Sequence, residues 1–292
     1  MLSVSVIIPT KNRPEFLKRA LYSVLNQTYK VSEIIIVDDF SDFQEYSFIT
    51  DARVKLIRNT SSLGGALSRN IGVDNSTSDL IMFLDDDDAW DVRKVEDQIK
   101  LFNDEEVGIV FSGKQVVYDT NLNLPVRNII PNIKQINFSA LCECNYIGST
   151  SSVALRRVDF LRVSGFDDNL KCFQDYDLWL RICKDKKAVF DSKCNVYYTV
   201  FRKEGMQISR AIDGRHIVAG HYLINKYEKE MSHSELKMFK MNINQLISKA
   251  LNFSDPKKAI YFSIKSILVK PSIRGFKFFL ASLASSLGYK HG

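Results

Sequence analysis

The chain has 292 residues, of which 45% are hydrophobic and 25% are charged. This composition is typical of one large α/β domain, or of a main domain with a smaller appendage, and it excludes a disordered chain. The net charge of +6 arises near the C-terminus, because residues 226–292 contain 12 Lys and Arg but only 4 Asp and Glu.

Cysteine usage and the hydrophobic profile bear on the compartment. The five cysteines are odd in number and lack paired CxxC spacing, so we expect reduced, buried thiols in a cytosolic protein and no zinc site. Residues 1–9 lack the basic region of a signal peptide, and no window of about 18 uncharged apolar residues indicates a transmembrane helix. We therefore expect a cytoplasmic protein.

Four short runs of apolar, mostly β-branched residues stand in the N-terminal third of the chain. They are VSVIIP (4–9), EIIIVDD (33–39), VKLIRN (54–59) and DLIMFLDDDD (79–88). Each run is almost continuously hydrophobic, as strands buried on both faces require. Helical patterns separate them, one beginning at Pro14 and one after a glycine pair at 64–65. This alternation predicts an α/β fold with a doubly wound, mostly parallel sheet of the Rossmann type.

Polar and acidic residues follow each of these four strands. They are Pro9 to Arg13, Asp38-Asp39, Arg58-Asn59 and Asp85 to Asp88. In open parallel sheets, ligands bind outside the carboxyl ends of the strands. Arg69, on the helix after the glycine pair, can approach a phosphate together with the glycine backbone. The pattern therefore predicts a site for a cation and an anionic ligand.

The run Asp85 to Asp88 needs its own explanation, because two carboxylates about 5 Å apart repel by roughly 3 kcal/mol at an effective dielectric constant of about 20. Such a run is either a solvated turn or a metal site. An EF-hand loop over residues 85–96 is excluded, because Trp90 stands where that loop requires glycine. The turn after the first strand lacks GxGxxG, which argues against a dinucleotide-binding fold.

Seven blocks of the chain carry a longer pattern. They are VSVIIPTKNR, IIIVDDFSD, GGALSRNIGV, IMFLDDDDAW, VGIVFSG, NYIGSTSSVALRR and GFDDNLKCFQDYDLWLRI. In order and spacing these blocks, within residues 3–200, resemble the motifs of family 2 glycosyltransferases with the GT-A fold. The resemblance implies inverting transfer of a sugar from a nucleotide diphosphate donor, usually UDP, with a divalent cation.

The resemblance also implies a division of the chain. Residues 1–110 are expected to bind the nucleotide-sugar donor, and residues 111–210 to form the acceptor-binding half of the same GT-A domain. Residues 211–292 are expected to be a helical, basic and amphipathic C-terminal extension.

Roles in donor binding are implied by position in those motifs. Four residues after the first strand should border the nucleotide: Pro9, Thr10, Asn12 and Arg13. Asp39 should accept hydrogen bonds from uracil or ribose, and Arg69 should lie near the base or the phosphates.

The Asp run matches the DxD motif of the family. Asp85 is implied to contact the donor ribose or sugar and to share the metal, and Asp87 to bind Mn²⁺ or Mg²⁺ against the diphosphate. Oxygen ligands suit either ion. Asp86 is placed in the donor site as the middle residue of the motif, although Asp86 and Asp88 can alternatively serve only to cap the next helix.

The block QDYDLWLRI (174–182) resembles the motif that carries the catalytic base. It implies that Asp175 takes the proton from the acceptor hydroxyl, and an N-cap role for Asp175 is the alternative. Asp177 is expected to pair with Arg181. The loop 145–151 is expected beside the acceptor.

One motif of the family is missing. Many relatives carry a histidine after the last core strand, but residues 197–209 contain none, so Arg202 or Lys203 is the candidate for holding the diphosphate. His216 and His221 are interpreted as packing or surface residues.

Two basic amphipathic helices are predicted at the C-terminus, the first beginning at Ser254-Asp255-Pro256. Their apolar faces comprise Ile260, Ile264, Ile267 and Leu268, and then Ile273, Phe276, Leu280, Leu283 and Leu287. These faces either pack on the main domain or lie on the anionic cytoplasmic face of a membrane. Nucleic acid is not an expected partner, because the basic residues alternate with aliphatic ones.

The resemblance to family 2 implies a metal-dependent inverting glycosyltransferase that moves a sugar from a UDP-sugar to a hydroxyl of a saccharide acceptor. By analogy with that family alone, the acceptor is expected to be lipid-linked, on undecaprenyl diphosphate, in surface polysaccharide, O-antigen or lipopolysaccharide assembly at the inner face of the cell membrane. Two alternatives stay open: a nucleotidyltransferase that makes a nucleotide-sugar, and a sugar-nucleotide binding protein without turnover.

Overall fold

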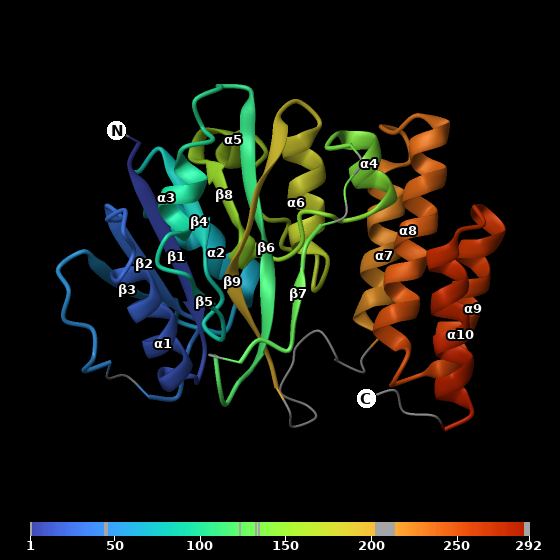
Figure 1. Cartoon of the computed structure of the whole chain (residues 1–292), viewed down its shortest axis with the longest axis horizontal. Coiled ribbons are helices and arrows are strands. Elements are labelled where there is room, and N and C mark those ends of the chain that lie inside the picture. Colours follow the sequence, from blue (N-terminus) through green and yellow to red (C-terminus); the bar gives the residue numbers. More distant parts are fainter. Residues whose placement is uncertain are drawn as a thin grey trace. The chain divides into compact units, whose positions relative to one another are not determined.

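The computed structural model describes residues 2–43, 46–122, 124–131, 133, 135–201 and 214–288. The chain forms two compact units (Figure 1). The first unit comprises Met1–Asn137, Tyr146–Asp168 and Gln174–Arg202, and the second comprises Phe138–Asn145, Asn169–Phe173 and Lys203–Gly292. Arg202 and Lys203, expected to replace the missing histidine, lie outside the described residues.

The first unit contains the sheet and most of the motif blocks. Its elements are β1 (Val4–Thr10), α1 (Pro14–Leu25), β2 (Glu33–Asp38), β3 (Val54–Arg58), α2 (Gly65–Asp74), β4 (Leu80–Phe83), β5 (Ala89–Trp90), α3 (Lys94–Ile99), β6 (Val107–Tyr118), β7 (Arg127–Ile129), the 3-10 helix η1 (Thr150–Ser152), β8 (Val153–Arg156), α5 (Arg157–Arg162), α6 (Gln174–Cys183) and β9 (Lys187–Val200). All four predicted strands are present, as are the helices after Pro14 and after the glycine pair.

The strands form one sheet in the order β3-β2-β1-β4-β8-β6-β9-β5, and β7 pairs with β6. Strands β3, β2, β1 and β4 are parallel neighbours, because helical segments connect β1 to β2 and β3 to β4. Strand β8 runs antiparallel to β4 and β6, and β5 runs antiparallel to β9. The α/β fold is therefore confirmed, with a sheet that is parallel up to β4 and mixed beyond it.

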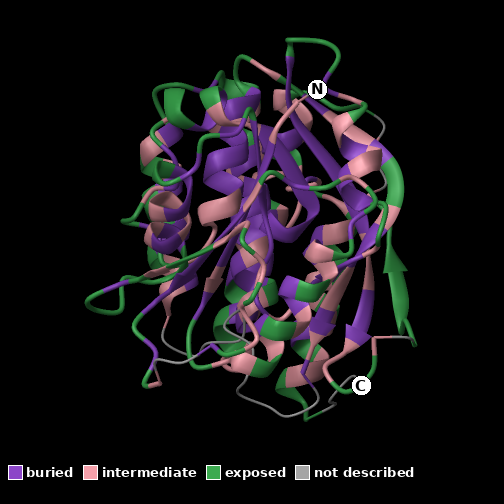
Figure 2. Cartoon of the chain, turned by 90° about the vertical axis from the view of Figure 1, so that its left-hand side faces the viewer, coloured by how far each residue is buried: buried purple, intermediate pink, exposed green. Residues whose placement is uncertain are grey.

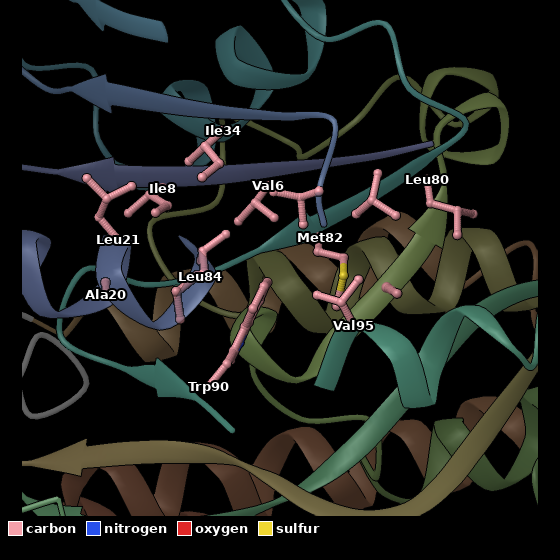
Figure 3. Packing of buried hydrophobic residues seen from close by; sticks show 14 of the residues in the cluster. Val6, Ile8, Ala20, Leu21, Ile34, Leu80, Met82, Leu84, Trp90 and Val95 are labelled. Carbon is pink, nitrogen blue, oxygen red and sulfur yellow. The ribbon is translucent and has the colours of Figure 1, made fainter. Parts of the chain in front are cut away.

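Helices cover both faces of the sheet, and buried residues concentrate between the layers (Figure 2). On one face, Ala20 and Leu21 of α1 pack against Ile8 of β1, and Trp90 points toward Leu84 (Figure 3). On the other face α2 approaches β1 closely, since a Cβ atom on Gly72 would lie 2.4 Å from Ile7 Cγ2. The doubly wound arrangement follows from apolar side chains on both faces of β1.

Strand β3 departs from the expectation that all four strands are buried on both faces. Leu56 in its middle is 41% exposed. The reason is its place in the sheet, because β3 is the edge strand and, among the residues that the structure describes, pairs only with β2. An edge strand tolerates charged side chains such as Lys55 that a central strand excludes.

The described helices of the second unit are α4 (Phe138–Glu143), α7 (Arg215–Tyr227), α8 (His233–Leu251), α9 (Pro256–Val269) and α10 (Ile273–Ser286). The predicted start of α9 is confirmed, since the Asp255 carboxylate accepts a hydrogen bond of 3.1 Å from the Lys258 N–H. Within the described residues, every helix is too short or too polar to cross a bilayer.

The histidines agree with the sequence prediction, and the cysteines agree with it only in part. All five cysteines are free, but only Cys142 and Cys183 are buried, whereas Cys144, Cys172 and Cys194 are partly exposed. His216 is buried and packs edge-on against Phe173, with ring centroids 5.5 Å apart, and His221 is exposed.

Candidate active site at the carboxyl ends of the strands

Asp85 to Asp88 form a tight turn at the carboxyl end of β4. The Asp88 N–H donates a 3.0 Å hydrogen bond to the Asp85 carbonyl oxygen. Asp85 and Asp87 keep partial access to solvent, whereas Asp86 and Asp88 are buried. Alternate carboxylates of the turn therefore face different surroundings, as they do in a DxD motif whose first and third residues meet a ligand.

The Asp85 carboxylate connects three segments of the chain. Its Oδ1 accepts a 2.5 Å hydrogen bond from Arg69 Nη2 on α2 and a 3.1 Å bond from Thr150 Oγ1 on η1. The Asp85 N–H donates to Ser151 Oγ at 3.1 Å. The loop 145–151, expected beside the acceptor, thus supports the first aspartate of the turn, a role that the sequence did not indicate.

Asp86 and Asp87 are held by the segment that follows β1. Thr10 Oγ1 donates to Asp86 Oδ2 at 2.8 Å, and Arg13 Nη1 lies 3.3 Å from Asp86 Oδ1 and 3.0 Å from Asp87 Oδ2. Burial and the neighbouring Asp87 carboxylate raise the pKa of Asp86 to about 7. Burial and the nearby Asp85 also raise the pKa of Asp87. The structure therefore brings Thr10, Arg13, Asp86 and Asp87 together.

Asp88 connects the turn to β9, the last strand in chain order. Its Oδ1 accepts a 2.9 Å hydrogen bond from the Thr199 N–H on β9. Burial, followed by the charge of Asp87, raises the pKa of Asp88 well above its ordinary value. The alternative that Asp86 or Asp88 caps the next helix is wrong, because α3 begins only at Lys94 and its N-cap is Arg93.

Arg19 is a site residue that the sequence analysis missed. Its Nη2 donates to the Asp87 carbonyl oxygen at 2.5 Å and to Thr199 Oγ1 at 3.0 Å, and its Nη1 donates to the Asp119 carbonyl oxygen at 3.3 Å. In the sequence, Arg19 is one charged residue on an amphipathic helix, next to the exposed Lys18. Only the fold distinguishes the two cations.

Asp39 organises the loop that leads into α2. Each of its two carboxylate oxygens accepts two hydrogen bonds, and the four donors are Asn59 Nδ2 (2.9 Å), the Leu63 N–H (2.7 Å), Ser62 Oγ (2.9 Å) and the Gly64 N–H (2.9 Å). Burial alone would raise the pKa of Asp39, but these hydrogen bonds hold it below its ordinary value. The contact of Asp39 with uracil or ribose stays a prediction.

The other two residues predicted at the nucleotide lie at the same edge. Pro9 pairs in register with Val37 of β2. Asn12 has a positive φ of 55° and is fixed by Asp42, with Asn12 Nδ2 donating to Asp42 Oδ2 at 2.9 Å and the Asp42 N–H donating back to Asn12 Oδ1 at 2.8 Å. This pair joins the ends of β1 and β2.

The predicted base, Asp175, lies in the first turn of α6 and keeps partial access to solvent. The protein around it desolvates the carboxylate and raises its pKa, whereas the charges of Lys114 and Arg69 act to lower it. Asp85 acts on the same carboxylate as a like charge. Asp175 therefore lies within the electrostatic range of Asp85 and of Arg69, which itself pairs with Asp85 at 2.5 Å.

The surroundings of Asp175 distinguish it from Asp177. Asp175 is the second residue of α6 rather than its N-cap, and its Oδ1 accepts a 2.7 Å hydrogen bond from the Tyr176 N–H. Asp177 is fully buried and pairs with Arg181 at 2.7 Å. The structural role predicted for Asp177 is confirmed.

The residues of the turn suit a divalent cation that is shared with a ligand. The side chains of Asp85 and Asp87 are 29% and 23% exposed, and both offer carboxylate oxygens. Among the described residues, no three Asp, Glu, His or Cys side chains form a complete ligand set. A cation held here would complete its coordination with oxygens of a bound diphosphate or with water.

Comparisons with known proteins bear on the family to which the chain belongs. A model of the family "Glycosyl transferase family 2" matches residues 5–163. The chain is 28% identical over 261 residues to the UDP-Glc:alpha-D-GlcNAc-diphosphoundecaprenol beta-1,3-glucosyltransferase WfaP of Escherichia coli, which covers 88% of this chain and 99% of that protein. It is 30% identical over 189 residues to an uncharacterized glycosyltransferase of Haemophilus influenzae, and that match spans only 62% of either protein.

A solved structure shares the fold. The mannosyltransferase PcManGT from Pyrobaculum calidifontis, in complex with GDP-Man and Mn²⁺, has a TM-score of 0.62 at 17% identity, covering 99% of this chain and 88% of that one. The family match includes β1, the Asp39 loop, α2 and the Asp run. The chain therefore belongs to glycosyl transferase family 2 and has the GT-A fold.

Proposed function

We propose that this protein is an inverting glycosyltransferase that transfers a sugar from a UDP-sugar to a hydroxyl group of a lipid-linked saccharide. The observation that carries the proposal is the placement of Asp175 in the electrostatic range of Asp85 and Arg69. An inverting transfer needs a base on the acceptor side and positive charge at the leaving group within one site. The first unit supplies groups of both kinds.

Donor binding is assigned to the carboxyl ends of β1, β2 and β4. Arg13 and Arg69 carry fixed positive charge beside the Asp run, where a diphosphate would lie. The start of α2 lies beside Asp39 at the same edge, and the N-terminus of a helix favours an anion. A Mn²⁺ or Mg²⁺ ion held by Asp85 and Asp87 would stabilise the negative charge that grows on the departing nucleotide.

The acceptor side is assigned to Asp175. Its carboxylate would accept the proton of the acceptor hydroxyl while that oxygen attacks the anomeric carbon from the face opposite the nucleotide. Partial desolvation makes Asp175 a stronger base than a fully solvated aspartate, because burial disfavours the charged form. The positive charge of Lys114, whose Nζ lies 3.2 Å from Ser149 Oγ, acts to lower the pKa of Asp175 and so favours its ionised form.

Likeness to WfaP supports the choice of UDP and of an acceptor linked to undecaprenyl diphosphate, because its name states both. Such an acceptor carries a long hydrocarbon chain and is held in a membrane. The proposal therefore includes a cytoplasmic enzyme that works peripherally on that membrane, in surface polysaccharide or O-antigen assembly.

The test is a transfer assay with the full chain, Mn²⁺, a panel of UDP- and GDP-sugars and an undecaprenyl-diphosphate-linked acceptor. UDP release and a β-linked product are expected with one UDP-sugar. Asp175→Asn should lower the rate of transfer by a factor of about 10³ or more while donor binding persists. Asp185→Asn, the same change at an exposed position just beyond α6, is the matched control.

Two results would overturn the proposal. Release of pyrophosphate from a nucleoside triphosphate and a sugar phosphate would identify a nucleotidyltransferase. Tight binding of a UDP-sugar with equal, negligible turnover in the parent chain and in Asp175→Asn would identify a binding protein.

A further inference from the structure

With the exception of Phe262, helices α9 and α10 bury small or polar side chains rather than large apolar ones. The residues they bury are Ala259, Phe262, Ser263 and Ser266 on α9, and Gly275 and Ser282 on α10. The two helices lie side by side (Figure 1) and approach closely, since a Cβ atom on Gly275 would lie 3.2 Å from Ile267 Cγ1. Close packing through small residues is typical of helices whose outer surface is in contact with lipid.

The large apolar side chains of these helices face outward. They are Tyr261, Ile264 and Leu268 on α9, and Ile273, Phe276, Leu280, Leu283 and Leu287 at and just beyond α10. We call these eight residues the outer apolar stripe. Leu268 is 80% exposed, Ile273 79% and Leu280 61%. In each helix the members recur every three or four residues, so the apolar face continues along the whole helix.

This arrangement is the reverse of an amphipathic helix in a soluble protein, which buries its large apolar residues against the core. Isolated exposed leucines need no explanation, whereas a continuous apolar stripe indicates an interaction surface. The occupant of such a surface must also fit its charges.

Between residues 256 and 288 every charged side chain is basic. Two of these lysines have an acidic partner from outside that segment, since Lys258 pairs with Asp255 at 3.0 Å and Lys270 with Glu143 at 3.6 Å. The described basic residues are Lys257, Lys258, Lys265, Lys270, Arg274 and Lys277, and the sequence contains no acidic residue after Asp255. Lysine and arginine side chains can extend from an apolar surface so that their charged ends reach an aqueous interface. A surface of this composition complements a layer with an apolar interior and anionic head groups.

We propose that α9 and α10 insert the outer apolar stripe into one leaflet of an anionic membrane, with the surrounding basic residues at the head groups. Each helix has 14 residues and is therefore about 21 Å long, which is shorter than the roughly 30 Å hydrocarbon core. The pair therefore lies within the interface and does not cross it. This inference deepens the proposed action on a lipid-linked acceptor by naming the part of the chain that enters the lipid.

Depth-dependent fluorescence quenching tests insertion. The native Trp90 and Trp179 are buried, with 3% and 0% exposure, so they contribute a constant background. A tryptophan placed on the stripe, Leu280→Trp, is expected to shift its emission to the blue on vesicles of phosphatidylglycerol and phosphatidylcholine and to be quenched by brominated acyl chains. Val158→Trp, at a position 67% exposed on α5, should show neither effect.

Vesicle flotation of the full chain separates insertion from simple charge attraction. The double variant Leu268→Asn, Leu280→Asn should float about tenfold less than the parent chain, and Val158→Asn should float like the parent. Flotation of the double variant at the parent level, or absence of quenching in Leu280→Trp, would overturn the inference. The inference would also be overturned if the double variant changed its oligomeric state but floated like the parent chain. The outer apolar stripe would then be a contact surface for a second copy of the chain.

Donor hydrolysis without lipid, measured on the same variants, keeps the two proposals separate. The stripe lies outside the candidate active site, so this activity should be unchanged. If the parent chain showed no donor hydrolysis while Leu280→Trp was quenched by brominated lipid, the proposed function would be contradicted and membrane insertion would still be supported.

Discussion

Arg19 donates a 2.5 Å hydrogen bond to the backbone carbonyl oxygen of Asp87, and so fixes the backbone of the third aspartate of the turn. The same guanidinium binds Thr199 on β9. Asp88, one residue further on, accepts a hydrogen bond from the Thr199 N–H. The turn that would hold the cation is therefore supported by α1 and by β9, the last strand in chain order. Both elements are far from the turn in sequence.

Replacing Arg19 should impair turnover more than donor binding. Arg19→Met removes the bond to the Asp87 carbonyl oxygen, so the Asp87 carboxylate should lose its orientation, and kcat should fall roughly 10- to 100-fold. Steady-state kinetics and a melting curve check this expectation, with Lys18→Met on the exposed side of α1 as the matched control. A fall in melting temperature with an unchanged kcat in the folded fraction would reduce Arg19 to a purely structural residue.

The pH dependence of transfer should report the ionisation of Asp175. Burial raises the pKa of this carboxyl group, and a base must be deprotonated, so activity should fall on the acid side with a midpoint above the ordinary aspartate value. Lys114 lowers the pKa of Asp175, so Lys114→Met should move that midpoint upward.

The control for this profile is Lys187→Met, which removes an exposed lysine paired with Asp104 at 3.1 Å. Its pH profile should overlay that of the parent chain. If Lys114→Met left the midpoint in place, Asp175 would not be the group that limits the reaction in acid.

Removal of the metal should abolish transfer, and substitution of Asp87, the proposed metal ligand, should impair it strongly. EDTA is expected to stop UDP release, and added Mn²⁺ or Mg²⁺ to restore it. Asp87→Ala should lower kcat by about 100-fold or more at saturating cation, whereas Asp104→Ala, at an exposed aspartate remote from the turn, should not. Undiminished activity in EDTA would contradict a cation-assisted reaction.

Lys94 should make folding stability depend on pH near neutrality. Its side chain is fully buried, with Nζ 2.6 Å from Gln98 Oε1, and burial lowers its pKa from 10.5 to about 7. Between these values the unfolded chain binds a proton that the folded chain does not, so the free energy of unfolding rises as pH increases through that window.

Urea unfolding at pH 7 and pH 9 measures this effect. The stability of the parent chain relative to Lys94→Met should rise by about 2–3 kcal/mol between the two pH values, since one pKa unit corresponds to about 1.4 kcal/mol. Lys100→Met removes an exposed lysine on the same segment, and its stability relative to the parent chain should stay constant. Parallel pH dependence in the parent and Lys94→Met would show that Lys94 is charged or solvated in both states.

The sequence alone identified the strands and the edge of the sheet that carries the site. Continuous apolar runs predict β1, β2 and β4 because burial on both faces demands them, and the polar residues that follow mark their carboxyl ends. The exposure of β3 was not predicted, since an apolar run does not reveal whether a strand has one neighbour or two.

Contacts between distant segments explain most of what the sequence missed. Thr150 and Ser151 hold Asp85, and Arg19 holds Asp87, but none of the three differs locally from an ordinary loop or surface residue. Asp86 and Asp88 looked like helix caps because they precede α3, yet their partners are Thr10, Arg13 and Thr199.

The order of apolar and charged residues thus determined the fold class, the family motifs and the helical, basic C-terminus. Tertiary structure alone decided which aspartates of the run are open to a ligand, which arginine supports them, and which face of α9 and α10 is left exposed. The physical reason is that burial and hydrogen bonding are properties of three-dimensional neighbours, whereas local sequence sets only the conformation and polarity of each segment.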